Sequence, residues 1–374
     1  MSSSTAPQLE RLRFLDALRL GALGLLMLYH VGMYYVTWPW HIKSPWVSTA
    51  LEPWMNLINP WRMSLLFLIS GAVTTLLVRS DTLWLRARMR RLGLPLLVGV
   101  LLIVPPQSYW QVQQQMGYAG DYLDFMRLYL SGSKAFCQAA SDCLILPTWN
   151  HLWFLPYLMA YTLCLWVSLR VAPGWPDRCG AWLAQRLSAW SLLVLPWLIL
   201  SLGRAALRPW FDVTHALVND PLAHVQYAPA FLIGALWART PGVWSALAQL
   251  RHAALLIVLV TWGLRLMSLG LPAPLLSSLY AAQQWAGVVA AIGYAWVHCA
   301  QSNKWLSWLV ERIFAVYVLH QTLIMALAVA LRPLALTPIA EGLVLVAGTV
   351  GAALLIAAVC ERLPPTRVWL GLPR

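Results

Sequence analysis

The stretch FLDALRLGALGLLMLYHVGMYY, residues 14–35, decides the fold class of this chain. It is long enough to cross a bilayer, which takes about 20 mostly apolar residues. Yet the same stretch contains Asp16, Arg19 and His30. Ionisable side chains are costly in hydrocarbon and are retained there mainly for function. The stretch therefore predicts a transmembrane helix that carries part of a functional site.

The composition extends this prediction to the whole chain. Of the 374 residues, 60% are hydrophobic and 10% are charged, whereas a soluble domain has roughly 25% charged residues. We therefore expect an all-α, polytopic membrane helix bundle that forms a single domain over residues 1–374, with no separate soluble domain. About ten transmembrane helices are expected, at about residues 14–37, 60–78, 92–108, 151–170, 188–205, 226–240, 251–269, 277–299, 309–331 and 339–360.

The net charge of +13 is explained by the topology of a membrane protein rather than by binding of nucleic acid. Arginines concentrate in alternate connecting segments, most densely at residues 79–91 and 170–186, while most acidic residues lie in the others. Because Lys and Arg favour cytoplasmic loops, both termini are expected in the cytoplasm, in a multi-pass protein of the bacterial inner membrane. Cys137 and Cys143 share a polar loop that is expected to face outward. Whether they form a disulfide stays open.

Helical geometry relates the charged residues of the first helix. Asp16 and Arg19 are spaced i, i+3, which allows them to pair. Arg19 and His30 are eleven residues apart, or about three turns plus 20°, so they share a face about 16 Å apart along the axis. His30 lies about 24 Å along the helix from Phe14, beyond the middle of a core of about 30 Å. Histidine is the usual general base at neutral pH; the alternative is a structural histidine bonded to another helix.

Other polar residues in the apolar segments are weaker candidates. Arg62 is expected to bind an anion or to pair with a carboxylate, or else to extend to the outer membrane interface. Ser70 is interpreted as a structural or hydrogen-bonding residue without a nucleophile motif around it, and Gly71 as a possible site of close helix packing. Candidates to line a cavity with His30, or to be satisfied inside the bundle, are Asp16, Arg62, Ser70, His151, Tyr317 and His320.

A basic cluster follows the second expected helix and contains Arg86, Arg88, Arg90 and Arg91. Topology alone would produce such a cluster, and it would also suit a cytoplasmic, phosphate-rich ligand. The tryptophans within residues 38–61 are typical of an interfacial aromatic belt, with a sugar-stacking platform as the alternative. No cysteine spacing typical of a metal site is present, and no metal is expected.

Taken in order, these segments resemble the acyltransferase 3 family of integral membrane proteins. The resemblance rests on the Arg19–His30 spacing, Phe67-Leu-Ile-Ser70-Gly71, the basic cluster ending at Pro95, His151-Leu-Trp153, and Tyr317-Val-Leu-His320, over about residues 11–360. The Trp40-His41 and Arg62-Met63 pairs are similar to a branch that acylates osmoregulated periplasmic glucans, commonly with succinyl groups. The hydrolase-like domain fused to some family members is not seen in this sequence.

The resemblance implies an acyl-CoA donor, succinyl-CoA or acetyl-CoA, from the cytoplasm and a glycan acceptor on the outer side. Arg19, with Arg86, Arg88, Arg90 and Arg91, would bind the donor. His30 would act either as general base on the acceptor hydroxyl or as a nucleophile that carries the acyl group. One rival function is a transporter or flippase for a glycan or lipid-linked sugar without acyl chemistry; another is a membrane sensor.

Overall fold

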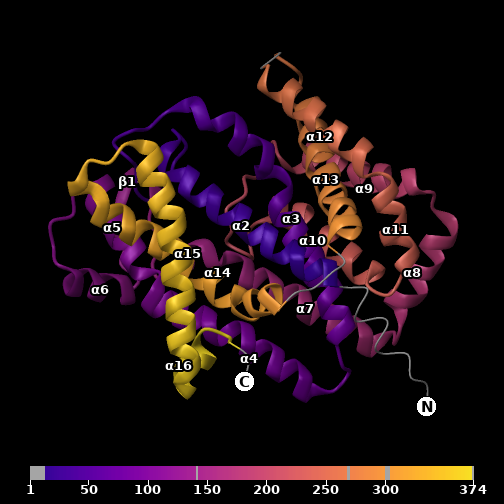
Figure 1. The fold of residues 1–374 in the computed structure, drawn as a ribbon, viewed down its shortest axis with the longest axis horizontal. Helices are drawn as coiled ribbons and strands as arrows, with labels where there is room; N and C mark the ends of the chain where they lie inside the picture. The colour runs from indigo at the N-terminus through magenta and orange to yellow at the C-terminus, as the bar shows by residue number, and fades with distance from the viewer. Residues whose placement is uncertain (1–12, 140–141, 268–269, 300–303, 373–374) are drawn as a thin grey trace. The chain divides into compact units, whose positions relative to one another are not determined.

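A computed structural model describes residues 13–139, 142–267, 270–299 and 304–372 of the chain. The described residues are overwhelmingly helical (Figure 1), which confirms the expected all-α membrane fold. Both chain ends lie outside these residues, so their cytoplasmic location stays a prediction.

Eight helical segments among the described residues are long and apolar enough to cross a membrane, and a ninth is possible if the pair Pro241–Gln249 and Arg251–Leu266, bent by 57°, forms one span. The expected number of about ten is therefore not confirmed. One expected span corresponds to a helix of only 17 residues, α10 (Pro221–Trp237). The eight segments are Arg13–Tyr35, Thr49–Leu77, Thr82–Met116, Asn150–Val171, Ala189–Leu207, Ala273–His298, Lys304–Leu334 and Pro338–Arg362.

The chain divides into two compact units, and the first comprises residues 1–25, 53–87 and 157–310. Its central helix is α13 (Ala273–His298), which packs against α9 (Ala189–Leu207), α11 (Pro241–Gln249) and α12 (Arg251–Leu266). Figure 1 shows α9, α12 and α13 beside one another. The unit also contains α8 (Trp175–Arg186), α10 and most of α3 (Glu52–Leu77) and α7 (Phe154–Val171).

Close helix packing in this unit depends on two glycines. A Cβ at Gly71 of α3 would overlap the backbone carbonyl of Phe231 on α10, and a Cβ at Gly234 of α10 would overlap the carbonyl of Leu68 on α3. Small residues of this kind let two backbones approach each other in a membrane. The packing interpretation of Gly71 is therefore confirmed.

The second unit comprises residues 26–52, 88–156 and 311–374. The helices α2 (Arg13–Tyr35) and α4 (Thr82–Val98) each continue from the first unit into the second, as does α14 (Lys304–Leu331). A π-helical turn, Gly99–Ile103, follows α4 directly. The remaining helices of the unit are α5 (Pro105–Met116), α6 (Tyr122–Leu130), α15 (Pro338–Arg362) and α16 (Pro364–Trp369).

Two very short strands, β1 (Cys137–Ala139) and β2 (Asp142–Cys143), pair antiparallel after α6. Cys137 and Cys143 are opposite each other in this pairing and form a disulfide. The question that the sequence left open is thus answered in favour of the bond.

Candidate active site

Three histidines from distant parts of the sequence meet in the second unit. His30 lies on α2, His320 lies on α14, and His151 lies in the 3-10 turn Asn150–Trp153 that precedes α7. His30 Nδ1 is 2.8 Å from His320 Nε2, although 290 positions separate the two residues. The rings of His151 and His320 are perpendicular, with centroids 5.0 Å apart. The site is therefore a contiguous cluster of imidazoles built around His320.

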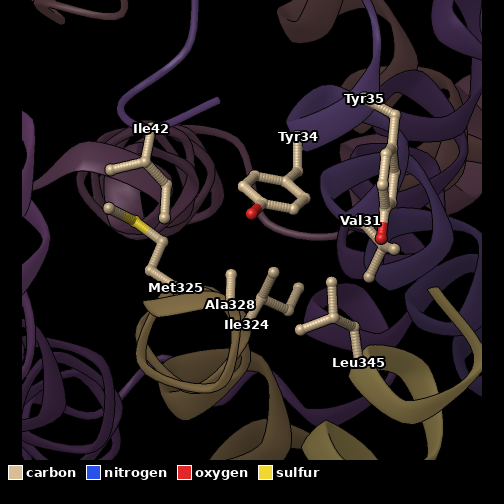
Figure 2. Packing of buried hydrophobic residues seen from close by; sticks show 8 residues of the cluster. All are labelled: Val31, Tyr34, Tyr35, Ile42, Ile324, Met325, Ala328 and Leu345. Atoms are coloured by element: carbon tan, nitrogen blue, oxygen red, sulfur yellow. The ribbon is translucent and has the colours of Figure 1, made fainter. Parts of the chain in front are cut away.

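An apolar cluster beside these histidines holds α2 against α14 (Figure 2). His320 is followed on its own face of α14 by Ile324 and Ala328, at i+4 and i+8, and both are in the cluster. His30 directly precedes Val31 and is one turn before Tyr34, which also belong to it. The contact between His30 and His320 thus continues the apolar packing of α2 on α14 by one helical turn. The full cluster contains Val31, Tyr34, Tyr35, Ile42, Ile324, Met325, Ala328 and Leu345.

The hydrogen bonds determine which nitrogen of each ring carries the proton. His320 Nδ1 lies 2.6 Å from the carbonyl oxygen of Tyr317, which can only accept, so this nitrogen donates. In a neutral imidazole the other nitrogen is then an acceptor. His320 Nε2 therefore accepts from His30 Nδ1–H, and the Nε2 atom of a neutral His30 carries a lone pair. This is the protonation state that a general base or a nucleophile requires.

The same argument determines which ring nitrogen of His151 carries the proton. Its Nε2 lies 3.0 Å from the carbonyl oxygen of Val318 and donates to it, which leaves Nδ1 to accept from the Gln107 amide at 3.3 Å. The Tyr317 hydroxyl donates to the backbone oxygen of His151 at 2.8 Å. His151 is thus held against α14 by hydrogen bonds to two residues of that helix, Tyr317 and Val318.

Gln107 of α5 organises the polar groups behind the histidines. Its Oε1 accepts from Asn150 at 3.1 Å and from Gln321 at 2.9 Å, and its Nε2 donates to Thr322 at 2.6 Å. A buried amide is stable only when its donors and acceptors are satisfied. None of these amide residues was predicted from the sequence. The signal that could have found them is Gln321, which directly follows His320 inside an apolar helix.

The π-helical turn Gly99–Ile103 brings Gln107 to this position. Pro105 follows the turn and has no N–H, so it cannot donate to a carbonyl in the turn before it. The carbonyl oxygen of Val100 accepts instead from the hydroxyl of Tyr129 at 2.8 Å, and that of Ile103 accepts from the hydroxyl of Thr322 at 2.7 Å. π-Helical turns are frequent at functional sites, and this one ties α5 to α14 next to the histidine cluster.

Exposure separates the roles that the three histidines can take. His320 is 0% exposed and His151 is also buried, whereas His30 is only partly buried. A reacting molecule needs an accessible atom, so His30 is the histidine of the three that it can contact. His320 and His151 can act only through their neighbours.

The charged residues at the start of α2 are in the first unit. Asp16 and Arg19 form the expected i, i+3 pair, with a carboxylate–guanidinium distance of 3.8 Å. The Asp16 and Arg19 side chains are 47% and 35% exposed. A long, partly exposed ion pair of this kind contributes little to stability. α2 is unbroken between Arg19 and His30, and their axial separation of about 16 Å follows from its geometry.

The remaining candidates of the first unit, Arg62 and Ser70, both lie on α3. Arg62 on α3 is buried and donates to the side-chain oxygen of Asn59 at 2.7 Å. Ser70 is half-buried on the same helix, beside the packing glycine Gly71. Arg62 and Ser70 belong to the first unit, whereas the three histidines belong to the second.

The basic cluster lies on α4, which begins at Thr82. Arg86, Arg90 and Arg91 are exposed, and Arg88 is partly buried. Exposed guanidinium groups on one helix provide planar, multiply donating contacts for phosphate oxygens.

Comparison with known proteins identifies the class to which this fold and site belong. The acyltransferase domain family, acyltransferase 3, matches residues 12–358. The chain is therefore a member of this family, and the resemblance noted in the sequence is confirmed.

Similarity to individual proteins is lower. Glucans biosynthesis protein C of Escherichia coli (strain SMS-3-5 / SECEC) is 27% identical over 237 residues, which cover 61% of this chain and 58% of that protein. Glucans biosynthesis protein C of Salmonella gallinarum (strain 287/91 / NCTC 13346) is 29% identical over 247 residues, 63% of this chain and 60% of that protein. The matched region thus spans less than two thirds of these relatives. No solved structure matches the chain.

Proposed function

We propose that this chain is a membrane O-acyltransferase that moves a succinyl or acetyl group from cytoplasmic acyl-CoA to a periplasmic glycan, in the first instance an osmoregulated periplasmic glucan. The family match and the similarity to glucans biosynthesis protein C support the class of reaction and of acceptor. The observation that carries the mechanism is the His30–His320 hydrogen bond, because it assigns the lone pair of His30 to Nε2.

In the proposed reaction His30 Nε2 takes the proton of the acceptor hydroxyl while the hydroxyl oxygen attacks the thioester carbon. The imidazolium that forms donates from Nδ1 to His320, whose own Nδ1–H is held by the Tyr317 carbonyl. The C–S bond then breaks, and the CoA thiolate takes the proton from His30. The alternative, in which His30 Nε2 itself receives the acyl group before the acceptor arrives, uses the same lone pair.

Donor binding is assigned to Arg19 and to Arg86, Arg88, Arg90 and Arg91 of α4. Arg19 is partly exposed, and it precedes His30 by about three helical turns on the same face. An extended pantetheine arm would connect a phosphate at Arg19 with a thioester at His30. Exposed arginines on α4 would bind further phosphate oxygens of the nucleotide.

The sidedness of the reaction is supported by the Cys137–Cys143 disulfide. Disulfides persist in oxidising compartments such as the bacterial periplasm and are rare in the cytosol. The loop that carries this bond is the one that the arginine distribution assigns to the outer side. An inner-membrane location with a periplasmic acceptor is consistent with both observations.

The test uses the purified full-length protein with labelled succinyl-CoA or acetyl-CoA and a periplasmic glucan. Label should appear on the glucan and free CoA should be released in equal amount. The flippase alternative predicts a different result: in proteoliposomes the glucan would cross the bilayer while no acyl group is transferred from either donor. That outcome would reject the proposed function.

A further inference from the structure

A cavity in the first unit is lined by three arginines that the proposed acyl transfer does not use. It has a volume of about 660 Å³ and lies where α9 and α12 end and α13 begins. Arg204 and Arg208 come from the end of α9 and its continuation, and Arg265 comes from the last turn of α12. The described residues that line the cavity include no carboxylate.

Arg204 is the residue that makes this cavity unusual. Its side chain is only 7% exposed, and its Nε has no hydrogen-bond partner. The guanidinium carbon lies 3.8 Å from the centre of the Tyr280 ring, and that of Arg265 lies 4.9 Å from the centre of the same ring. Two cations on one ring gain cation–π attraction but repel each other. A buried cation with an unsatisfied donor is stabilised when an anion pairs with its charge and accepts the missing hydrogen bond.

The other arginines have partial partners. Arg265 donates to the neutral amide of Gln283, which leaves its charge uncompensated there. Arg208 pairs with Asp212 at 2.9 Å, and both side chains are mostly exposed. The N-terminal residues Ala273 and Pro274 of α13 also line the cavity, and a helix N-terminus favours an anion. The charges of the cavity thus fit a phosphate group between Arg204 and Arg265.

An apolar groove of about 480 Å³ is formed by the same three helices. On α9, Arg204 is in phase with Trp197, at i−7, and Trp197 lines the groove. On α12, Arg265 is in phase with Thr261, at i−4, which also lines it. Adjacent residues of α13 line the two spaces: Ser277 lines the cavity and Ser278 lines the groove. The backbone oxygen of Ser278 accepts from Trp197, and its hydroxyl accepts from Ser201.

We infer that these two spaces together bind an anionic phospholipid, with its phosphodiester between Arg204 and Arg265 and one acyl chain in the groove formed by α9, α12 and α13. A free phosphate would use the arginines but not the groove. A zwitterionic lipid would bring its own cation next to three arginines. The attraction between clustered arginines and an anionic head group is the same as in the basic pockets that bind such lipids on the cytoplasmic side of other membrane proteins. This site does not depend on the proposed acyl transfer, and its test does not measure it.

Native mass spectrometry of the full-length protein in detergent provides the test, with phosphatidylglycerol, phosphatidylcholine and glycerol 3-phosphate as probes. Phosphatidylglycerol should bind most tightly, and Arg204→Gln or Arg265→Gln should weaken it by about tenfold or more, as expected for the loss of a charged hydrogen bond. Arg204→Lys keeps the charge and should retain more of the affinity. Arg127→Gln is the control, because Arg127 is an exposed arginine of the second unit that pairs with Asp124.

A second variant tests the groove without touching the arginines. Val260 lines the groove and is 50% exposed, so Val260→Trp should fill it while the fold is retained, as judged by size-exclusion chromatography. This variant should bind phosphatidylglycerol more weakly but leave glycerol 3-phosphate unaffected. Equal binding of the two phospholipids, or unchanged affinity in Arg204→Gln and Arg265→Gln, would overturn the inference. Glycerol 3-phosphate that binds as tightly as phosphatidylglycerol would show a site for soluble anions instead.

Discussion

Replacing His320 by leucine should slow acyl transfer although His320 itself is 0% exposed and cannot touch a substrate. The variant removes the acceptor of the His30 Nδ1–H bond, which is 2.8 Å long in the native protein. It also removes the constraint that keeps the lone pair of His30 on Nε2. His320→Gln is the matched variant, because a glutamine oxygen can take the place of the Nε2 acceptor.

The size of the effect follows from the change of charge on His30 during the reaction. A hydrogen bond between neutral groups contributes about 0.5–1.5 kcal/mol, and one to a charged group about 1.5–3 kcal/mol. The transition state, in which His30 is becoming an imidazolium, therefore loses about 1–1.5 kcal/mol more than the ground state. Since 1.36 kcal/mol corresponds to a factor of ten in rate, and loss of the tautomer adds to this, kcat should fall by about tenfold or more.

The assay is steady-state transfer of a labelled acyl group from acyl-CoA to glucan, with kcat and the KM of the donor determined separately. The expected order of kcat is native protein, His320→Gln, His320→Leu and then His30→Ala, with the donor KM little changed in both His320 variants. Equal loss in His320→Gln and His320→Leu, in protein that is still folded by size-exclusion chromatography, would refute the hydrogen-bond argument. So would native kcat in His320→Leu.

Three further predictions concern other parts of the chain. Arg19→Ala should weaken acyl-CoA binding by about tenfold, the lower end for a charged hydrogen bond because Arg19 is partly exposed, while glucan binding measured by calorimetry is unchanged; equal donor affinity would contradict the role. Gly71→Ala should destabilise the protein by about 1–3 kcal/mol through backbone overlap. Gly263→Ala, where no atom lies within 4 Å of the added Cβ, should show no such drop in unfolding temperature. Gln107→Leu should cost about 1–3 kcal/mol because the buried amide of Gln321 is left without an acceptor, and an unchanged unfolding temperature would contradict this.

The features that the sequence predicted correctly depend on the geometry of a single helix or on composition. The Asp16–Arg19 contact follows from the helical repeat. The membrane class follows from composition, because 60% of the residues are hydrophobic. The number of spans was less predictable, since α10 has 17 residues and α12 has 16, which is short for a bilayer core of about 30 Å.

The contacts between distant segments could not be predicted in the same way. The sequence singled out His151, Tyr317 and His320 as possible neighbours of His30, but the hydrogen bond between His30 and His320 depends on how α2 packs on α14. The tautomers depend in turn on backbone carbonyls, whose positions no side-chain pattern reveals. Gln107 was missed because a glutamine near the end of an apolar segment is as typical of a membrane interface as of a buried network.

The central claim is that the Nε2 atom of His30 accepts the proton, or the acyl group, in the transfer step. Chemical rescue of His30→Ala tests it most directly, because free imidazole can supply the missing lone pair. Acyl transfer from labelled acyl-CoA to glucan should fall by about 10²–10⁴-fold in His30→Ala and should rise again in proportion to added imidazole. Transfer at the native rate in His30→Ala without imidazole would contradict the claim.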